Sequence, residues 1–315
     1  MSKKISIIGA GNVGATIAYT LTMDGMASEL VLVDINEDKA KGEALDIIQG
    51  TPFCPPVDIY AGNYSDIANS DIVIITSGIP RKEGQSRLDL AQNNVNLMKE
   101  MGPELVKHAP DAIYVVVSNP VDVMTYTLIK STGLPERQVV GSGTVLDSAR
   151  LRSDIADSLD VNPKNVHAYV FGEHGDSSFV PWSLATISGM PLEAFYREKR
   201  KLDPGFTDID LDGYEENVRT SGSKIISKKG ATYYAIALSV RRICDCIVRD
   251  TNSILTVSGM IHDRYGMDDV CLSLPFVVNK DGIEYAVSPE ILPEEEEKLT
   301  NSYNVLREMI DSLDI

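Results

Sequence analysis

Short hydrophobic runs alternate with longer amphipathic segments through the first half of the chain. The hydrophobic runs are rich in Ile and Val, which favour strands, and the segments between many of them repeat apolar residues at helical spacing. Alternation of this kind is typical of a parallel sheet that helices cover on both faces. The predicted strands are residues 5–8, 30–33, 58–61, 72–76, 113–118 and 139–141, and the predicted helices are 13–24, 39–49, 88–107 and 121–131.

The second half of the chain has a different pattern. A long helical stretch reaches from about 212 to 248 with an interruption near 228–230, and a last helix is predicted at 293–313. Strand-like runs lie between these helices, at 254–259, 270–278 and 283–286. Because the change of pattern falls near residues 141–145, we expect two domains, residues 1–143 and residues 144–315.

Charge and cysteine content narrow the classes of partner and compartment. Acidic residues outnumber basic ones by 46 to 29, and the formal net charge of −17 argues against nucleic acid or an anionic membrane as a partner. No stretch of about 18 apolar residues is present to span a bilayer. The four cysteines form no Cys-x-x-Cys pair, so we expect free thiols, a cytoplasmic location and no metal site.

A glycine-rich segment, Gly9-Ala-Gly11-Asn12-Val13-Gly14, directly follows the first predicted strand and opens a helix. This context predicts a dinucleotide site, with glycines for a tight turn, for close approach of a pyrophosphate and for helix–strand packing. Asp34 ends the second strand, twenty residues after Gly14, and can accept hydrogen bonds from ribose hydroxyls. Its charge would repel a 2′-phosphate and Ile35 offers no cation, so NAD is favoured over NADP.

A second group of residues carries the side chains that acid–base chemistry needs. Asp147 and Arg150 are three positions apart in a helical pattern, so they share a face. His174 stands between two glycines, and a histidine suits proton donation to a ketone that accepts hydride. Either Asp147 or Asp176 could fix its tautomer, and Arg150 could grip a substrate carboxylate with two hydrogen bonds.

Together these motifs resemble the L-lactate/malate dehydrogenase family, in order and over essentially the whole chain. The resemblance rests on Gly-Ala-Gly-Asn-Val-Gly, Val-Ser118-Asn119-Pro120-Val-Asp, Leu-Asp147-Ser-Ala-Arg150 and Gly-Glu-His174-Gly-Asp. It implies an α/β chain with a Rossmann-type doubly wound parallel sheet, followed by an α+β substrate domain. It also implies an NAD-dependent oxidoreductase acting on a small anionic 2-hydroxy acid.

The resemblance assigns roles to single residues. It implies that His174 is the acid/base and Asp147 its partner, that Arg150 pairs with the substrate carboxylate, and that Arg87 polarises the carbonyl when its loop closes. Asn119 is expected to hydrogen-bond near the reacting oxygen, across a cis bond to Pro120. The residues expected to contact the cofactor are Gly9, Gly11, Asn12, Val13, Gly14, Asp34, Ser118 and Asn119.

The cationic segment 79–87 bears on the choice of substrate, because it carries Arg81 six positions before Arg87. In the family, lactate enzymes usually have glutamine at this position and malate enzymes have arginine. Facing the methyl group of pyruvate, Arg81 would be a partly buried cation without a partner, which costs several kcal/mol. Arg81 therefore argues for a second substrate carboxylate, as in oxaloacetate, unless it turns to solvent and pairs with Glu83.

The rest of the chain resembles lactate dehydrogenases. The segment Lys229-Gly-Ala-Thr232-Tyr-Tyr is of lactate type, with Thr232 narrowing the pocket near the variable end of the substrate, and Gly143-Thr-Val-Leu-Asp147 is also of lactate type. We therefore expect L-lactate dehydrogenase activity (pyruvate and NADH to L-lactate and NAD⁺), with malate dehydrogenase or mixed activity as the alternative.

Two further residues indicate an effector. In bacterial lactate dehydrogenases the positions of Arg152 and His167 form a fructose 1,6-bisphosphate site across a subunit interface, and cations from two subunits suit a bisphosphate. The resemblance also implies a homo-oligomer, with a tetramer expected. The related NAD-dependent glycosidases need Cys and His metal ligands on motifs that this chain lacks. A binding-only protein would be expected to lose the catalytic residues, all of which are present here.

Overall fold

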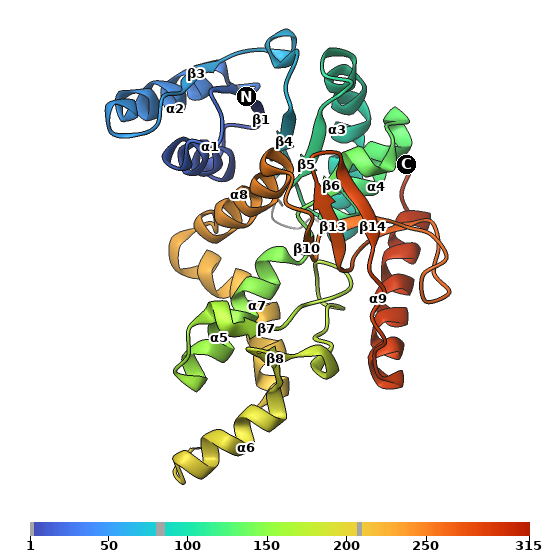
Figure 1. The fold of residues 1–315 in the computed structure, drawn as a ribbon. Helices are drawn as coiled ribbons and strands as arrows, with labels where there is room; N and C mark the ends of the chain where they lie inside the picture. The colour runs from blue at the N-terminus through green and yellow to red at the C-terminus, as the bar shows by residue number, and fades with distance from the viewer. Residues whose placement is uncertain (1–2, 80–85, 207–209) are drawn as a thin grey trace.

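The computed structural model describes residues 3–79, 86–206 and 210–315, and a mixed eight-stranded sheet forms its centre (Figure 1). The strand order is β12-β11-β6-β5-β4-β1-β2-β3. The strands are β1 (Lys4–Ile8), β2 (Glu29–Val33), β3 (Asp58–Ala61), β4 (Ile72–Ile75), β5 (Ile113–Val116), β6 (Val139–Gly141), β11 (Ser258–Ile261) and β12 (Val270–Ser273).

The first six strands are parallel and their order reverses between β1 and β4. In open sheets of this kind, ligands bind outside the carboxyl ends of the strands where the order reverses. The helices pack in two groups, α1 with α2 and α8, and α3 with α4. Their bounds are α1 (Asn12–Asp24), α2 (Glu37–Gln49), α3 (Arg87–His108), α4 (Val121–Thr132) and α8 (Tyr234–Arg249).

The remaining elements belong to the second half of the chain or connect the strands. Two three-stranded sheets contain β7 (Val166–His167), β8 (Thr186–Ile187) and β9 (Met190–Pro191), and β10 (Ser253–Leu255), β13 (Phe276–Asn279) and β14 (Gly282–Ala286). The further helices are α5 (Val145–Leu159), α6 (Leu192–Leu202), α7 (Leu211–Lys229) and α9 (Pro293–Asp311). The 3₁₀ turns are η1 (Thr51–Phe53), η2 (Tyr64–Ile67), η3 (Glu136–Gln138), η4 (Pro163–Asn165) and η5 (Trp182–Leu184).

The elements predicted for the first half are confirmed, with ends that differ by at most two residues. Helix α2 begins two residues earlier than predicted because the Asn36 side chain accepts a hydrogen bond from the Lys39 N–H at 3.1 Å and caps it. Strand β5 ends at Val116, two residues earlier than predicted, and the chain then turns into the segment that contains Pro120.

The strand predictions for the second half were wrong in one respect. Residues 254–259 and 270–278 were each expected to form one strand, but each divides between two sheets. Strands β10 and β13 pair with each other, whereas β11 and β12 join the main sheet in antiparallel orientation. Pro275 lies at the second division, and a proline cannot donate a ladder hydrogen bond. Helix α6 and the sheet of β7, β8 and β9 were not predicted.

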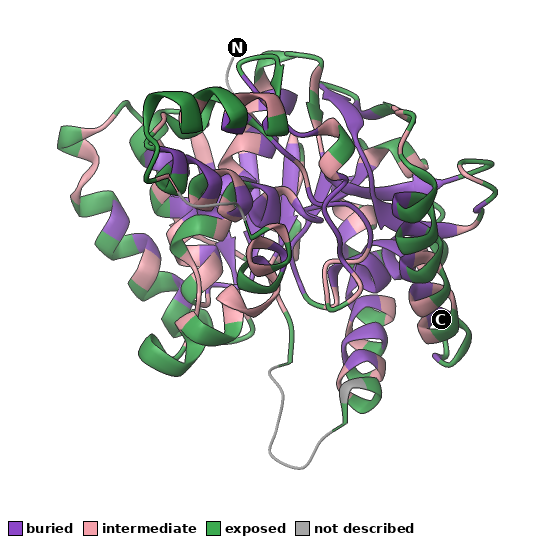
Figure 2. Ribbon diagram, turned by 90° about the horizontal axis from the view of Figure 1, so that it is seen from below, coloured by how far each residue is buried: buried purple, intermediate pink, exposed green. Residues whose placement is uncertain are grey.

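The core follows the sheet, whose central strands are buried on both faces while the outer faces of the helices are exposed (Figure 2). A second hydrophobic cluster lies around α5 and α7 and contains Leu151, Ile155, Val166, Ile187 and Val218. This smaller core supports α5, which carries Asp147 and Arg150. The two halves of the chain also share the main core, because α8 packs against α1 and β11 against β6.

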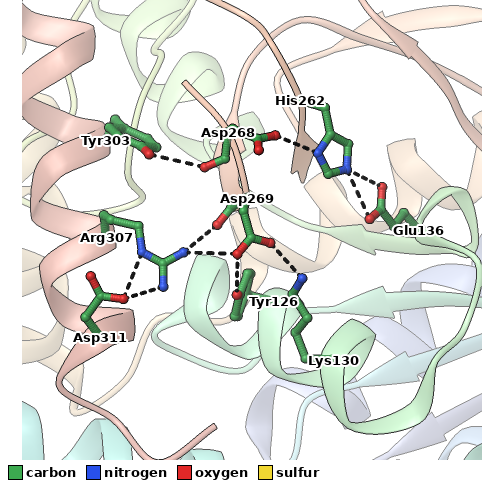
Figure 3. A network of polar contacts seen from close by, with 9 residues as sticks. All are labelled: Tyr126, Lys130, Glu136, His262, Asp268, Asp269, Tyr303, Arg307 and Asp311. Carbon is green, nitrogen blue, oxygen red and sulfur yellow. Dashed lines mark hydrogen bonds and ion pairs between the residues drawn. The ribbon is translucent and has the colours of Figure 1, made fainter. Parts of the chain in front are cut away.

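A polar network ties α9 to α4 and to the β11–β12 connection (Figure 3). We call it the Asp269 network: the Asp269 carboxylate accepts from Tyr126 at 3.0 Å and pairs with Lys130 at 2.6 Å, and Arg307 donates to the Asp269 carbonyl at 2.6 Å. Beside it, His262 bridges Asp268 at 2.8 Å and Glu136 at 2.9 Å. These contacts join segments from both halves of the chain.

None of the helices in the described ranges is long and apolar enough to cross a membrane. The four cysteines are free thiols, as expected. Cys244, Cys246 and Cys271 are buried, whereas Cys54 is partly exposed.

Candidate active site

The glycine segment forms a tight connection between β1 and α1. Gly9 has a φ of +104°, and a Cβ there would lie 2.7 Å from Thr76 Oγ1. At Gly14 a Cβ would lie 1.8 Å from the Gly9 carbonyl oxygen, so only glycine allows the helix to start this close to the strand. Gly11 has open space on its Cβ side and provides the N-cap of α1 without a side-chain hydrogen bond. The helix N-terminus is thus accessible to a pyrophosphate.

Asp34 is fixed at the end of β2 by two main-chain donors. Its Oδ2 accepts from the Ala10 N–H at 2.6 Å and its Oδ1 accepts from the Asn36 N–H at 2.8 Å. A carboxylate has about four lone-pair sites, so ribose hydroxyls can still bind it. The neighbouring Ile35 is fully exposed. The acceptor beside the glycine turn and the open N-terminus of α1 therefore fit an adenosine ribose and pyrophosphate of NAD.

The carboxyl ends of β4 and β5 bring further predicted residues to the same edge of the sheet. Ser118 is buried, with its hydroxyl donating to the Ser77 carbonyl at 2.5 Å, and Asn119 is exposed. The Asn119–Pro120 peptide bond is cis, as expected. Asn12 and Val13 occupy the first turn of α1, where Val13 packs against the main core.

Asn94, a buried residue of α3, was not identified from the sequence. Its amide donates to the Asn119 carbonyl at 3.0 Å, and its side-chain oxygen accepts from the Ile79 N–H at 2.7 Å. Asn94 thus joins the Asn119 turn to the residue that precedes segment 80–85. No sequence signal marked it, because an Asn in a helical pattern is usually exposed.

The acid–base residues meet at a single carboxylate. Asp147 Oδ2 lies 2.6 Å from His174 Nδ1, and Asp147 Oδ1 lies 2.8 Å from an N–H of Arg150. The spacing left Asp147 and Asp176 as alternative partners of the histidine, and the family resemblance implied Asp147. The ring bonds to Asp147, while Asp176 is exposed. A guanidinium carries five N–H donors, so the ion pair leaves Arg150 able to bind a substrate carboxylate.

The charges of this cluster favour a protonated histidine. The Asp147 carboxylate raises the pKa of His174 to about 9, against the effect of burial, which lowers it. Burial pushes the pKa of Asp147 upward, but the charges and hydrogen bonds of His174 and Arg150 outweigh it, so the pKa of Asp147 is lowered. His174 is therefore an imidazolium at neutral pH, with its Nδ1–H donated to Asp147 and its other N–H free to act as an acid.

The other predicted substrate residues stand as follows. Thr232 lies half-buried in the connection between α7 and α8, and both helices pack against α5. A Cβ on Gly222 of α7 would lie 4.0 Å from the Arg150 guanidinium. Arg87 is the first residue of α3, after an N-cap at Ser86, and its side chain lies outside the described atoms. Arg81 falls in residues 80–85, outside the described residues.

The two expected effector residues lie on neighbouring elements. Arg152 is in α5 and donates to the Pro163 carbonyl of η4 at 3.2 Å, and His167 is exposed in β7. Both η4 and β7 pack against α5. Arg152 Nε is buried and has no hydrogen-bond partner among the residues that the structure describes. The remaining N–H donors of the Arg152 guanidinium suit an anionic ligand.

Two family models cover the chain. Residues 3–141 match the lactate/malate dehydrogenase NAD binding domain, and residues 144–314 match the lactate/malate dehydrogenase alpha/beta C-terminal domain.

The similar proteins include bacterial lactate dehydrogenases. The chain is 48% identical over 313 residues to an L-lactate dehydrogenase of Acetivibrio thermocellus, covering 99% of this chain and 98% of that protein. It is 44% identical over 310 residues to L-lactate dehydrogenase 1 of Clostridium acetobutylicum, covering 98% of each.

The fold is also similar to solved structures. The minor L-lactate dehydrogenase of Enterococcus mundtii matches with a TM-score of 0.94 and 37% identity, over 100% of this chain and 99% of that one. A lactate dehydrogenase from a Medee basin deep-sea metagenome library matches with a TM-score of 0.92 and 38% identity, over 99% and 98%. With its NAD site and its His–Asp–Arg cluster, the chain belongs to the lactate/malate dehydrogenase family of NAD-dependent oxidoreductases.

Proposed function

We propose that this enzyme reduces pyruvate to L-lactate with NADH, and catalyses the reverse reaction. The observation that carries the proposal is the pairing of His174 with Asp147 beside Arg150, because it provides a charged acid and an anion-binding cation in one cluster. The relatives named L-lactate dehydrogenase, at 44–48% identity over nearly the whole chain, favour pyruvate over oxaloacetate as the substrate.

In this proposal each residue acts on the charge of the substrate. Arg150 binds the carboxylate, and Thr232 and Asn119 limit where the rest of the molecule lies. The bound dinucleotide supplies the hydride. His174 gives its proton to the ketone oxygen, and the imidazolium and Arg87 stabilise the negative charge that grows there. Asp147 keeps the histidine charged until that transfer.

Arg81 is the one observation that favours a second substrate. An arginine facing the methyl group of pyruvate would lack a partner, whereas oxaloacetate would give it a carboxylate. We infer that Arg81 permits some oxaloacetate reduction beside the main activity.

The test compares kcat/KM for pyruvate and oxaloacetate in the wild type, in Arg81→Gln and in Lys82→Gln. The lysine variant is the matched control, because it removes a neighbouring charge from the same segment. Arg81→Gln should move the ratio towards pyruvate by at least about tenfold, the worth of roughly 1.4 kcal/mol. An unchanged ratio would show that Arg81 does not face the substrate, and a wild type inactive on pyruvate would end the main proposal.

We further propose that fructose 1,6-bisphosphate activates the enzyme by binding Arg152 and His167. The guanidinium of Arg152 on α5 and the exposed ring of His167 on the adjacent β7 support an anion there. The effector should lower KM for pyruvate and raise Tm, and Arg152→Gln should abolish both effects. Arg249→Gln, which removes a cation paired with Asp245 at 2.8 Å, serves as the control. No change in kinetics or Tm on adding the effector would contradict the site.

We also propose that the enzyme is a cytoplasmic homo-oligomer, with a tetramer expected, because the effector site would need cations from two subunits. The free thiols support a reducing compartment. Light scattering of the purified chain measures the oligomer, and a monomer at all concentrations would contradict both the tetramer and the shared effector site.

A further inference from the structure

A second carboxylate, Asp122, lies beneath the histidine. It is the second residue of α4 and stands two positions after Pro120 of the cis Asn119–Pro120 bond, and its exposed fraction is only 2%. Asp122 Oδ2 accepts a hydrogen bond from the His174 main-chain N–H at 2.8 Å. The acid thus contacts the backbone of the same residue whose ring Asp147 binds.

The other side of Asp122 faces β11. The Ser258 hydroxyl lies beside its carboxylate and favours the charged form. Within the ranges that the structure describes, however, Asp122 Oδ1 and Ser258 Oγ have no hydrogen-bond partner of good geometry. A buried carboxylate with an unsatisfied oxygen is costly, so its presence beside a functional histidine needs a reason.

The segment that carries His174 is held at two points. Gly172 exchanges main-chain hydrogen bonds with Ser273 of β12, at 2.9 and 3.1 Å. Two residues later, Asp122 holds the His174 N–H. The backbone at His174 is therefore fixed both by the main sheet and by the N-terminus of α4. The ring of His174 is fixed by Asp147 of α5.

We propose that Asp122 is a positioning residue for His174, which fixes its main chain and places a second negative charge near its imidazolium. The first part rests on geometry alone. The second part deepens the proposed function, because it concerns the proton that His174 would transfer. Asp147 binds the ring directly, whereas Asp122 acts through the backbone and through its charge.

The charges around the two residues agree with this role. The Asp147 charge is the main cause of the raised pKa of His174, and the Asp122 charge adds to it while Arg150 opposes it. Burial raises the pKa of Asp122 to about 6, against the Ser258 hydroxyl and the N–H and charge of His174, and Glu173 raises it further. Burial is the main cause of the raised pKa of Cys271 in β12, and the negative charge of Asp122 raises that pKa further. Asp122 is thus charged at neutral pH and neutral below about pH 6.

The test is a titration of the four histidines of the full-length protein by NMR, with ¹⁵N-labelled histidine, in the wild type and in Asp122→Asn. Asparagine keeps an oxygen acceptor for the His174 N–H but removes the charge. The midpoint of the His174 titration should fall by about one pH unit, the lower end of the effect of a nearby charge. Glu295→Gln is the matched control, because Glu295 is also buried and accepts main-chain hydrogen bonds, from Ser183 and Leu292.

Kinetics provide the second readout. The high-pH limb of kcat/KM for pyruvate should move to lower pH in Asp122→Asn by the same amount as the NMR midpoint, whereas Glu295→Gln should leave the limb in place. Asp122→Ala, which also releases the main chain, should lower kcat as well. A purely structural acid would lower Tm without moving either pH midpoint.

An unchanged His174 midpoint in folded Asp122→Asn would overturn the proposal. The NMR result does not depend on which substrate the enzyme reduces, so it can hold even if the pyruvate activity is absent. If Asp122→Asn does not fold, the NMR titration of the wild type alone tests the proposal. Ionisation of Asp122 should then add a second, smaller inflection near pH 6 to the His174 resonance, and a single inflection would refute the coupling.

Discussion

At the scale of single residues, one carboxylate connects the imidazole of His174 and the guanidinium of Arg150, which are the proposed proton donor and the proposed anion-binding cation. Each oxygen of Asp147 has its own partner, His174 at 2.6 Å and Arg150 at 2.8 Å. The carboxylate therefore fixes the imidazole ring in orientation and in charge, and it also holds the guanidinium on the same side of α5. The effects of substitutions at these three residues should therefore not be additive, because the residues share one hydrogen-bonded network.

The first prediction concerns the acid itself. His174→Gln should leave NADH binding largely intact, because the glycine turn and Asp34 lie on other elements, and it should lower pyruvate reduction by roughly 10²–10⁴-fold. Cofactor fluorescence titration measures the binding and steady-state kinetics the rate. Turnover near that of the wild type would remove His174 from the role of acid.

The second prediction concerns pH. Reduction of a ketone needs protonated His174, so kcat/KM for pyruvate should be level at neutral pH and fall above about pH 9, where the histidine loses its proton. Oxidation of lactate needs the neutral ring and should rise through the same pH. In Asp147→Asn the pH dependence of both pyruvate reduction and lactate oxidation should move to lower pH. The reason is that the substitution removes the main cause of the raised pKa of His174. Limbs that stay in place would contradict the pairing.

At the scale of elements, the site is built where a strand gives way to a helix. Gly9 has a positive φ, and Gly14 lets the first turn of α1 lie against the Gly9 carbonyl. Asp34 at the end of β2 then accepts from Ala10, so the second strand helps to hold the turn that follows the first. The cofactor site thus depends on how closely β1, β2 and α1 pack.

The third prediction uses two glycines in helices. A Cβ at Gly14 would lie 1.8 Å from the Gly9 carbonyl oxygen, whereas a Cβ at Gly42 in α2 would meet nothing within 4 Å. Gly14→Ala should therefore weaken NADH binding by more than about tenfold, roughly 1.4 kcal/mol, and lower Tm. Gly42→Ala should leave binding unchanged and stabilise the protein by up to about 1 kcal/mol. Calorimetry and cofactor titration of both variants measure this, and equal effects would contradict the packing argument.

At the scale of the whole molecule, the two halves of the chain share one sheet. Strands β11 and β12 come from the second half but extend the sheet beyond β6, and α8 packs against α1. The Asp269 network and the neighbouring His262 bridge add polar contacts across the same boundary (Figure 3). This arrangement keeps the His174 segment, which bonds to β12 and α4, in register with the cofactor edge.

The fourth prediction concerns the His262 bridge. Both ring nitrogens lie beside carboxylates, so the ring must be protonated to donate to both. The hydrogen bonds that it donates to Asp268 and then to Glu136 raise its pKa above 6.5. A raised folded pKa gives stability that is full below about pH 6.5 and lost as the pH rises through the folded pKa. The wild type should therefore exceed His262→Gln in Tm at pH 6, by a small margin because the histidine is about half exposed.

The margin should shrink as the pH rises through the raised pKa of His262, because the histidine loses its charge there. Thermal melts of both proteins from pH 6 to pH 9 measure it, and comparing the two proteins cancels the contribution of His174. The control is His108→Gln, a partly buried histidine near the end of α3. A margin that stays constant from pH 6 to pH 9 would contradict a charged bridge.

The sequence alone determined the strand–helix alternation and the glycine turn, and it placed Asp147 and Arg150 on one face of a helix. These features depend on residues that are near one another in the chain. Examples are the spacing of Gly9, Gly11 and Gly14 and the helical spacing of Asp147 and Arg150, which predict local structure without reference to distant segments. The same local logic predicted the first six strands and failed at 254–259 and 270–278, where partners far along the chain decide which residues pair.

The spacing along the chain could not choose between Asp147 and Asp176 as the partner of His174; the family resemblance implied Asp147, and the tertiary structure shows that contact. Only the tertiary structure brought Asn94 and Asp122 to the site. His174 is 27 positions from Asp147 and 52 from Asp122, and no local spacing encodes contacts between segments so far apart. The physical reason is that these contacts are fixed by packing: the main sheet and the smaller core around α5 set the distance between the carboxylates and the ring, and those distances set its charge.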